Sequence, residues 1–422
     1  MDNLVNLLKR KGTGPTMSKS LSHEDLLQID QFLADSSQSL TTLSTLLTAI
    51  VTLAPSPVEL EWIKRSRMNL TKIPYELRWL LSQTPESEFQ RVILDCISGT
   101  TLSRVEARRW MDKLFSDTPD WEKAAFLEAL RLRRESPEEN QAAHEMCLER
   151  SHRISTSWPE IIDISNGYDG FNRTPYLAPF VASVIAALGV RVVLHGIDEV
   201  SPKRGITTHK LLAAAGKNAI RCPADICHDL ERVGWTYIDQ TIFSPDIASL
   251  KPLRMAMVKR PILATVEKLC LPVTGAWTGM VTGYTHPPYK SKTVALIANL
   301  PLESGVIIRG SEGSSQPPLD RRCPQIRMGN QQIIDDGFVR PEDFHLQTLT
   351  SLPWESMSVE RNLQEGIDGL ANPQGISTDL IRYHTMQLLA SVSPPSLQGK
   401  NLETIVQNVI QSGKALERWA LF

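Results

Sequence analysis

Two short segments of this sequence combine residue types that suit phosphate binding or proton transfer. In the first, Asp163–Phe180, glycines, an arginine and small polar side chains follow an apolar run. The second, Gly189–Gly196, contains a histidine that could act as a base or contact a phosphate. A histidine at the end of a strand is also commonly a hydrogen-bonded core residue, so both interpretations stay open for His195. The candidate phosphate-binding residues of the pattern itself are Gly167, Gly170, Asn172, Arg173, Thr174 and His195.

The order of residues in these segments predicts a strand, a loop, a helix and a second strand. Ile161–Ile164 is apolar enough for a buried parallel strand, and so is Val190–Leu194. Gly167 and Gly170 permit a tight loop with positive φ after the first strand. The two strands would therefore place the loop and His195 at the same edge of a sheet.

The predicted helix covers residues 175–188. Asn172 or Thr174 could cap it, Pro175 would take its first position, and Gly189 would end it. The free N–H groups of a helix that follows a parallel strand attract anions. This arrangement predicts a phosphate-binding corner at the carboxyl edge of the sheet, with an ordinary strand-to-helix turn as the alternative.

The composition is that of a soluble globular protein. The chain has 422 residues, of which 41% are hydrophobic and 22% charged, and its net charge is −2. The length suggests two or three domains, and the charge means that nucleic-acid binding would need a local basic patch. No apolar run is long enough to span a bilayer and no signal peptide is recognisable, so we expect a cytoplasmic protein. Six scattered cysteines favour reduced thiols.

We expect an α/β protein with a small helical N-terminal domain, preceded by a helical extension. The expected segments are the N-terminal extension over residues 1–85, the small helical domain over 86–155 and the α/β domain over 156–422. In the second segment Ser103 and Glu106 fit a capping box. From about residue 160 strands and helices alternate, which predicts a mostly parallel sheet flanked by helices. The extension could dock to a protein partner or be a purely structural addition.

The succession of elements from about residue 90 onward resembles the anthranilate phosphoribosyltransferase family. The motifs that carry the resemblance stand in the family's order and are Ser98–Arg108 with Ala125–Arg133, Asp163–Ala178, Gly189–Gly196, Phe243–Pro245 and Gln411–Arg418. The resemblance implies a small helical domain beside a larger α/β domain, an active cleft between them and a homodimer. An active member would use phosphoribosyl pyrophosphate with magnesium.

The sequence departs from the family where diphosphate and metal are handled. An active member has a Gly-Thr-Gly-Gly-Asp loop, whereas Ser165–Asp169 keeps only its second glycine, Gly167, and Asp169. The bulky Tyr168 stands where the backbone should approach phosphate. Of a Lys-His-Gly-Asn-Arg element only His195 and Gly196 remain. Ser315 and Gln316 align with an Asp-Glu pair that binds magnesium, and neutral ligands hold a hard cation less well.

These departures resemble a divergent branch of the family that is associated with nucleic-acid binding. Its Gly-x-x-x-x-Asn-x-Thr-Pro loop matches Gly167–Pro175, and its Arg-Gly-x-Glu-Gly turn matches Arg309–Gly313. The resemblance adds Asp169, Gly196, Arg309 and Glu312 to the candidate ligand-binding residues. Glu312 is also the only candidate metal ligand, and no metal or cofactor is predicted beyond the magnesium of an active enzyme.

Two segments of the chain are rich in basic residues. Five cations and no carboxylate lie between Ser201 and Cys222, and seven cations and one carboxylate lie between Lys251 and Leu300. If the fold gathers them, they would form a phosphate-binding groove, with Trp277, Tyr284 and Tyr289 available to stack on bases. Solvated helix faces and core aromatics are the alternative. The candidate nucleic-acid-binding residues are Lys203, Arg204, Lys210, Lys259, Arg260 and Lys268.

We therefore expect an anthranilate phosphoribosyltransferase-like protein with altered diphosphate and metal motifs that binds DNA, RNA or another polyanion. The rival hypothesis is a working glycosyl- or phosphoribosyltransferase with changed metal handling. A protein-docking scaffold that uses the N-terminal extension is a third.

Overall fold

The computed structural model describes residues 2–422, which form two compact units. The first unit takes the chain up to residue 149 together with residues 249–266, and the second takes residues 150–248 and 267–422. The predicted N-terminal extension and small helical domain thus pack within one unit, and the division into three domains stays a prediction. No single helix among residues 2–422 is long and apolar enough to span a membrane. Helices α3 (Leu40–Thr52) and α4 (Pro57–Met68) meet that criterion only when taken together across a 118° bend.

The first unit is entirely helical. Its longer helices are α1 (Asp2–Lys11), α2 (His23–Ala34), α3 (Leu40–Thr52), α4 (Pro57–Met68), α6 (Glu88–Ile97), α7 (Arg104–Met111), α8 (Asp120–Arg133) and α9 (Pro137–Glu149). The capping box predicted at Ser103 and Glu106 is confirmed at the start of α7. A buried ion pair joins Lys11 on α1 to Glu59 on α4, with 2.7 Å between Nζ and Oε1. The N-terminal helix is therefore part of this unit's core.

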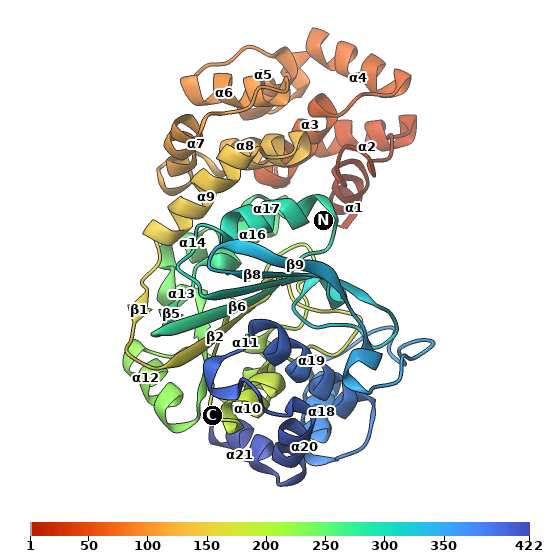
Figure 1. Cartoon of the computed structure of the whole chain (residues 1–422). Coiled ribbons are helices and arrows are strands. Elements are labelled where there is room, and N and C mark those ends of the chain that lie inside the picture. The colour runs from red at the N-terminus through yellow and green to blue at the C-terminus, as the bar shows by residue number, and fades with distance from the viewer. Residues whose placement is uncertain (1) are drawn as a thin grey trace. The chain divides into compact units, whose positions relative to one another are not determined.

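The second unit is built on a seven-stranded sheet (Figure 1). Its strands, in the order in which they pair, are β4 (Trp235–Asp239), β3 (Arg191–Gly196), β2 (Glu160–Ser165), β6 (Trp277–Gly283), β7 (Ser304–Ile308), β8 (Cys323–Gly329) and β9 (Gln332–Val339). The first five are parallel, and β8 and β9 are antiparallel additions at one edge. The predicted α/β class and mostly parallel sheet are confirmed.

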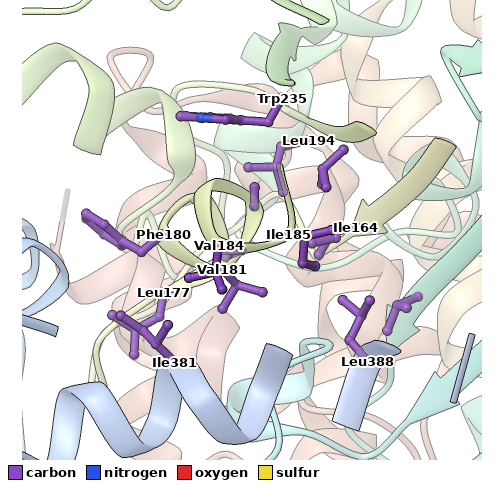
Figure 2. Packing of buried hydrophobic residues seen from close by; sticks show 14 of the residues in the cluster. Ile164, Leu177, Phe180, Val181, Val184, Ile185, Leu194, Trp235, Ile381 and Leu388 are labelled. Carbon is purple, nitrogen blue, oxygen red and sulfur yellow. The ribbon is translucent and has the colours of Figure 1, made fainter. Parts of the chain in front are cut away.

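Helices from two parts of the sequence pack beside one face of this sheet (Figure 1). They are α10 (Ala178–Ala187), α18 (Val359–Ala371), α19 (Ile376–Val392), α20 (Leu402–Gln411) and α21 (Lys414–Leu421). Figure 2 shows how Val181, Val184 and Ile185 of α10 lie between the strands and α19, which presents Ile381 and Leu388. All five side chains are no more than 1% exposed, so this face holds the core of the unit.

The start of α10 differs from the prediction. The helix begins at Ala178 rather than at Pro175, so neither Asn172 nor Thr174 caps it. Distant side chains take the backbone N–H groups that a cap would have served. Asn362 Oδ1 accepts from Tyr176 N at 2.7 Å, and Gln316 Oε1 accepts from Leu177 N at 3.1 Å. Because these bonds hold the backbone before α10, the first turn forms three residues later than its local sequence suggests.

Candidate functional site

The predicted corner lies where β2 and β3 end side by side. The two strands are parallel and pair Ile164 with Leu194. His195 Nε2 lies 3.1 Å from Asp163 Oδ1, and both side chains are fully buried. The other ring nitrogen, Nδ1, lies 2.6 Å from the hydroxyl of Tyr168. His195 is therefore a hydrogen-bonded core residue in a buried Asp-His-Tyr chain, and a ligand at the surface would not reach its imidazole.

Tyr168 fills the space in which the sequence pattern placed a ligand. Its side chain is buried, and burial raises the pKa of its hydroxyl well above the ordinary value, so the group stays protonated. The remaining cavity has a volume of about 10 Å³, at most the room of one water. It is lined by the loop after β2, by His195–Ile197 and by Tyr237. Gly167 and Gly196 thus border a space that the chain's own aromatic side chains occupy.

Gly170 allows two backbone segments to approach each other closely. Its φ is +74°, as the sequence pattern predicted, and a Cβ there would lie 2.5 Å from the carbonyl oxygen of Ile206. Phe171 and Ile206 exchange two backbone hydrogen bonds of 3.0 and 2.7 Å, and Gly205 N donates to Asp169 O at 2.8 Å. The loop after β2 is thereby fixed to the loop after β3.

A second anion-binding arrangement lies a few residues further along the same loop. The backbone N–H groups of Asn172, Arg173 and Thr174 all point at the carboxylate of Glu312, with N–O distances of 2.9–3.3 Å. Lys203 Nζ lies 3.2 Å from Glu312 Oε2, and the carboxylate-bearing side chain is only 4% exposed. Consecutive N–H groups that converge in this way form a concave anion site. Here the bound anion belongs to the protein.

The surroundings of Glu312 favour its charged form. Burial alone would raise the pKa of this carboxyl, but the Lys203 ammonium and the three N–H donors outweigh burial and lower the pKa below its usual range. Lys203 Nζ also donates to the carbonyl oxygens of Gly170 at 3.0 Å and of Glu312 itself at 3.1 Å. One lysine therefore joins the loops that follow β2, β3 and β7.

A pocket of about 260 Å³ opens beside this carboxylate. It is lined by Arg173, Thr174, Ser311, Glu312, Asp320, Arg321, Leu352 and Trp354. The side chains of Arg173 and Arg321 are 70% and 58% exposed, so both guanidinium groups face solvent. Arg309 of the predicted set is also exposed, and its Nε donates to Thr285 O at 3.0 Å. The pocket can therefore offer arginine side chains to an external anion.

Several cations of the basic segment 201–222 are already used inside the second unit. Lys203 binds Glu312, and Lys210 Nζ lies 3.0 Å from Glu199 Oε2. Lys217 and Arg221 donate to the carbonyl oxygens of Ala420 and Phe422, at the end of α21. Arg204 is exposed, with a positive φ of 51°. The segment therefore offers fewer free charges than its composition suggests.

The second basic segment requires a correction for two predicted residues. Lys268 is 7% exposed and donates to Gly283 O, and burial lowers its pKa to about 8. Lys259, in the first unit, is 8% exposed and donates to Lys9 O at 3.3 Å, and burial again lowers the pKa to about 8. Neither ammonium can reach a nucleic-acid backbone from these positions. Arg260 is exposed. Tyr284, predicted to stack on bases, is also buried.

The sequence prediction missed Arg321 and Arg322. Both are exposed, and they lie between β7 and β8, next to the turn that carries Glu312. The signal was present, because Asp320-Arg321-Arg322 is a charged cluster directly before a strand. It lay outside the two basic segments and so was not included.

Comparison with known proteins identifies relatives of this chain in sequence and in structure. Residues 90–151 match the model of the glycosyl transferase family, helical bundle domain. The anthranilate phosphoribosyltransferase of Synechococcus elongatus is 26% identical over 281 residues, which cover 65% of this chain and 79% of the relative. The crystal structure of the Thermus thermophilus anthranilate phosphoribosyltransferase matches with a TM-score of 0.65 at 20% identity, over 78% of this chain and 97% of that one. The chain thus has the fold of the anthranilate phosphoribosyltransferases and is similar in sequence to members of that family.

Two further relatives show the breadth of the likeness. An uncharacterised protein of Aquifex aeolicus is 26% identical over 251 residues, or 58% of this chain and 75% of the relative. The anthranilate phosphoribosyltransferase of Saccharomyces cerevisiae, solved in complex with PRPP and Mg, shares the fold with a TM-score of 0.58 at 15% identity, over 94% of this chain and 97% of that one. The family resemblance predicted from the motifs is confirmed, and its nucleic-acid-binding branch stays a prediction.

The residues at the family's metal position do not fit a magnesium ion. Ser315 is buried, and its N–H donates to Asn166 Oδ1 at 2.8 Å, while its hydroxyl lies 3.3 Å from His384 Nε2. Gln316 is buried too, with its amide bonded to the backbone of Pro175 and Leu177. Glu312 is engaged by Lys203 and by backbone donors. Magnesium prefers carboxylate and water oxygens with room for octahedral geometry, which this donor set does not offer.

Proposed function

We propose that this family member binds nucleic acid or another polyanion at the carboxyl edge of its sheet and does not transfer phosphoribosyl groups. The observation that carries the proposal is the use of the corner's anion-binding N–H groups by Glu312, while arginine side chains beside them face solvent. A diphosphate would have to displace an internal carboxylate, whereas a phosphodiester chain needs only exposed cations.

The exposed arginines lie on loops that meet at one edge of the sheet. The loops that follow the parallel strands β2, β3 and β7 carry them, and the carboxyl ends of parallel strands share an edge. These arginines are Arg173, Arg204, Arg309, Arg321 and Arg322. Arg321 Nη1 lies 2.8 Å from Asp320 Oδ1. Within residues 2–422, Arg204, Arg309 and Arg322 form no ion pair with a carboxylate, so their charge is available to a ligand.

The arrangement gives a quantitative expectation for salt dependence. If about four of these arginines neutralise phosphates, the logarithm of the binding constant should fall with the logarithm of salt concentration with a slope of roughly −3 for a single strand and about −3.5 for a duplex. The relevant experiment is fluorescence anisotropy of labelled single- and double-stranded oligonucleotides over a salt series, with the full chain.

A matched pair of triple variants isolates the proposed surface. Changing Arg173, Arg321 and Arg322 to Glu should weaken binding at least a hundredfold and reduce the salt slope by about 2 to 3. The control changes Arg361, Lys400 and Lys414 to Glu, three exposed cations near the C-terminal helices, and alters the net charge equally. Equal losses of oligonucleotide affinity in the two variants would show that net charge alone explains the effect. No binding by the unmodified protein at low salt would refute the proposal.

The rival function is phosphoribosyl transfer, which the names of the curated relatives favour. Its test is magnesium-dependent release of pyrophosphate from phosphoribosyl pyrophosphate, with anthranilate as the first acceptor. Turnover by the unmodified chain that is lost in Glu312→Ala would establish the rival. A homodimer, a cytoplasmic location and a protein partner for residues 1–85 remain predictions.

A further inference from the structure

The carboxylate of Glu312 is bound as an external oxyanion would be. Three consecutive N–H groups and one ammonium surround it, the oxygens lie within 3.3 Å of each donor, and Arg173 Nε lies 4.0 Å away. The donors come from the loops after β2 and β3, and the acceptor comes from the loop after β7. A tetrahedral phosphate offers more acceptor oxygens and more charge to the same donors than a carboxylate does.

We propose that Glu312 is the specificity-determining residue of this corner, because its side chain acts as a built-in competitor that excludes phosphate and diphosphate from an otherwise complete oxyanion site. The inference goes beyond polyanion binding and does not depend on it. The site is complete because backbone donors do not vary with side-chain identity, so removal of the carboxylate leaves the three N–H groups and Lys203 in place.

The backbone at Glu312 supports this role. The residue has φ 52° and ψ 19°, a left-handed conformation that is uncommon for residues other than glycine. Gly310 and Gly313 flank the turn, and at both positions a Cβ would come within 2.3 Å of a neighbouring atom. A strained residue persists only where its contacts hold it. Here those contacts are the bonds of its carboxylate to the donors of Asn172–Thr174 and Lys203.

The adjoining pocket gives an external anion a route to the donors. Its volume of about 260 Å³ exceeds what a phosphate needs, and Arg173, Thr174 and Glu312 all line it. Thr174 Oγ1 is buried without a hydrogen-bond partner among the described residues, which leaves one more donor for an oxyanion. With Glu312 in place, its negative charge repels a second anion that enters this pocket.

The test uses inorganic phosphate and pyrophosphate as probes in isothermal titration calorimetry of the full chain at low salt. Glu312→Ala should bind pyrophosphate at least tenfold more tightly than the unmodified protein. Glu312→Gln should give a smaller gain, because the amide still fills the site but no longer pairs with Lys203. Asp320→Asn is the matched comparison, since it removes a carboxylate from the same pocket and the ion-pair partner of Arg321 without freeing the backbone donors, so its gain in pyrophosphate affinity should be clearly smaller than that of Glu312→Ala.

Two results would overturn the inference. The first is equal pyrophosphate affinity in Glu312→Ala and in the unmodified protein, with thermal unfolding showing that the variant is folded. The second is an equal gain in Asp320→Asn, which would reduce the effect to general electrostatics. Adding Lys203→Met to Glu312→Ala should abolish the gain, and Glu312→Gln provides a readout if Glu312→Ala is only marginally stable. Oligonucleotide affinity, measured in parallel, tests the proposed function separately.

Discussion

Replacement of Tyr168 by phenylalanine tests the buried hydrogen-bonded chain that closes the corner. The hydroxyl lies 2.6 Å from His195 Nδ1 and 3.3 Å from the carbonyl oxygen of Glu267, and the tyrosine is 4% exposed. Phenylalanine keeps the ring but leaves the imidazole nitrogen without its partner. A buried polar group that loses its partner costs about 1–3 kcal/mol, so we expect Tyr168→Phe to lower the free energy of unfolding by about 2 kcal/mol.

We expect about 2 kcal/mol rather than the lower end of this range because the hydrogen-bonded chain of side chains continues to Asp163. Asp163 Oδ1 lies 3.1 Å from His195 Nε2, and its Oδ2 has no hydrogen-bond partner within residues 2–422. The buried carboxylate therefore depends on the imidazole, and a loosened imidazole weakens both contacts.

Urea denaturation followed by tryptophan fluorescence measures the effect of Tyr168→Phe. Because the chain has two units, the transition that responds must first be assigned by comparing fluorescence with far-ultraviolet circular dichroism. Tyr75→Phe is the matched control, since Tyr75 is 62% exposed and its removal should change the free energy by less than about 0.5 kcal/mol. If Tyr168→Phe proves as neutral as Tyr75→Phe, the hydrogen bond to His195 does not stabilise the fold and the reasoning fails.

Two further predictions concern the ion pair of the first unit. Lys11→Met leaves the Glu59 carboxylate buried without its cation and should lower the free energy of unfolding by about 3–5 kcal/mol. The double variant Lys11→Met with Glu59→Gln should recover part of this loss. No recovery in the double variant would contradict the pairing. Burial alone would raise the pKa of Glu59, but Lys11 and the N–H groups of Ser56 and Leu21 outweigh burial and lower the pKa. The ion pair's contribution to the free energy of unfolding is therefore complete above the ordinary pKa of 4.5 and is lost as the pH falls through the lowered pKa. Urea midpoints between pH 7 and pH 3 should therefore fall less for Glu59→Gln than for the unmodified protein.

The sequence predicted elements whose ends are decided locally. The local sequence predicts a helix over residues 223–232, and α12 (Pro223–Arg232) has those bounds, because a proline in the first turn and an aspartate that closes a capping box specify its start. Ser412-Gly413 likewise predicts a break in the C-terminal helix, and it separates α20 from α21, where Gly413 adopts a positive φ of 76°. In both cases the deciding residues lie within four positions of the boundary, so no tertiary information was needed.

The parts that could not be predicted depend on partners far along the chain. Helix α10 starts later than predicted because Gln316 and Asn362 bond to the preceding backbone from 139 and 186 residues away. Glu312 was assigned to an external ligand or a metal, yet it binds the backbone at Asn172–Thr174, and nothing near either segment indicates the other. The count of basic residues could not reveal that Lys203 and Lys210 have internal partners.

The contact between Glu312 and its donors also bears on how a ligand would be received at this edge of the sheet. Lys203 and the turn at Glu312 connect the loops after β2, β3 and β7 into a single framework, from which Arg173 and Arg321 project. A framework of this kind has its shape before a ligand arrives. Association would then immobilise side chains but little backbone, and the entropic cost of binding would be small. The loops whose substitutions distinguish this chain from the diphosphate-binding pattern are therefore the ones that make its surface rigid.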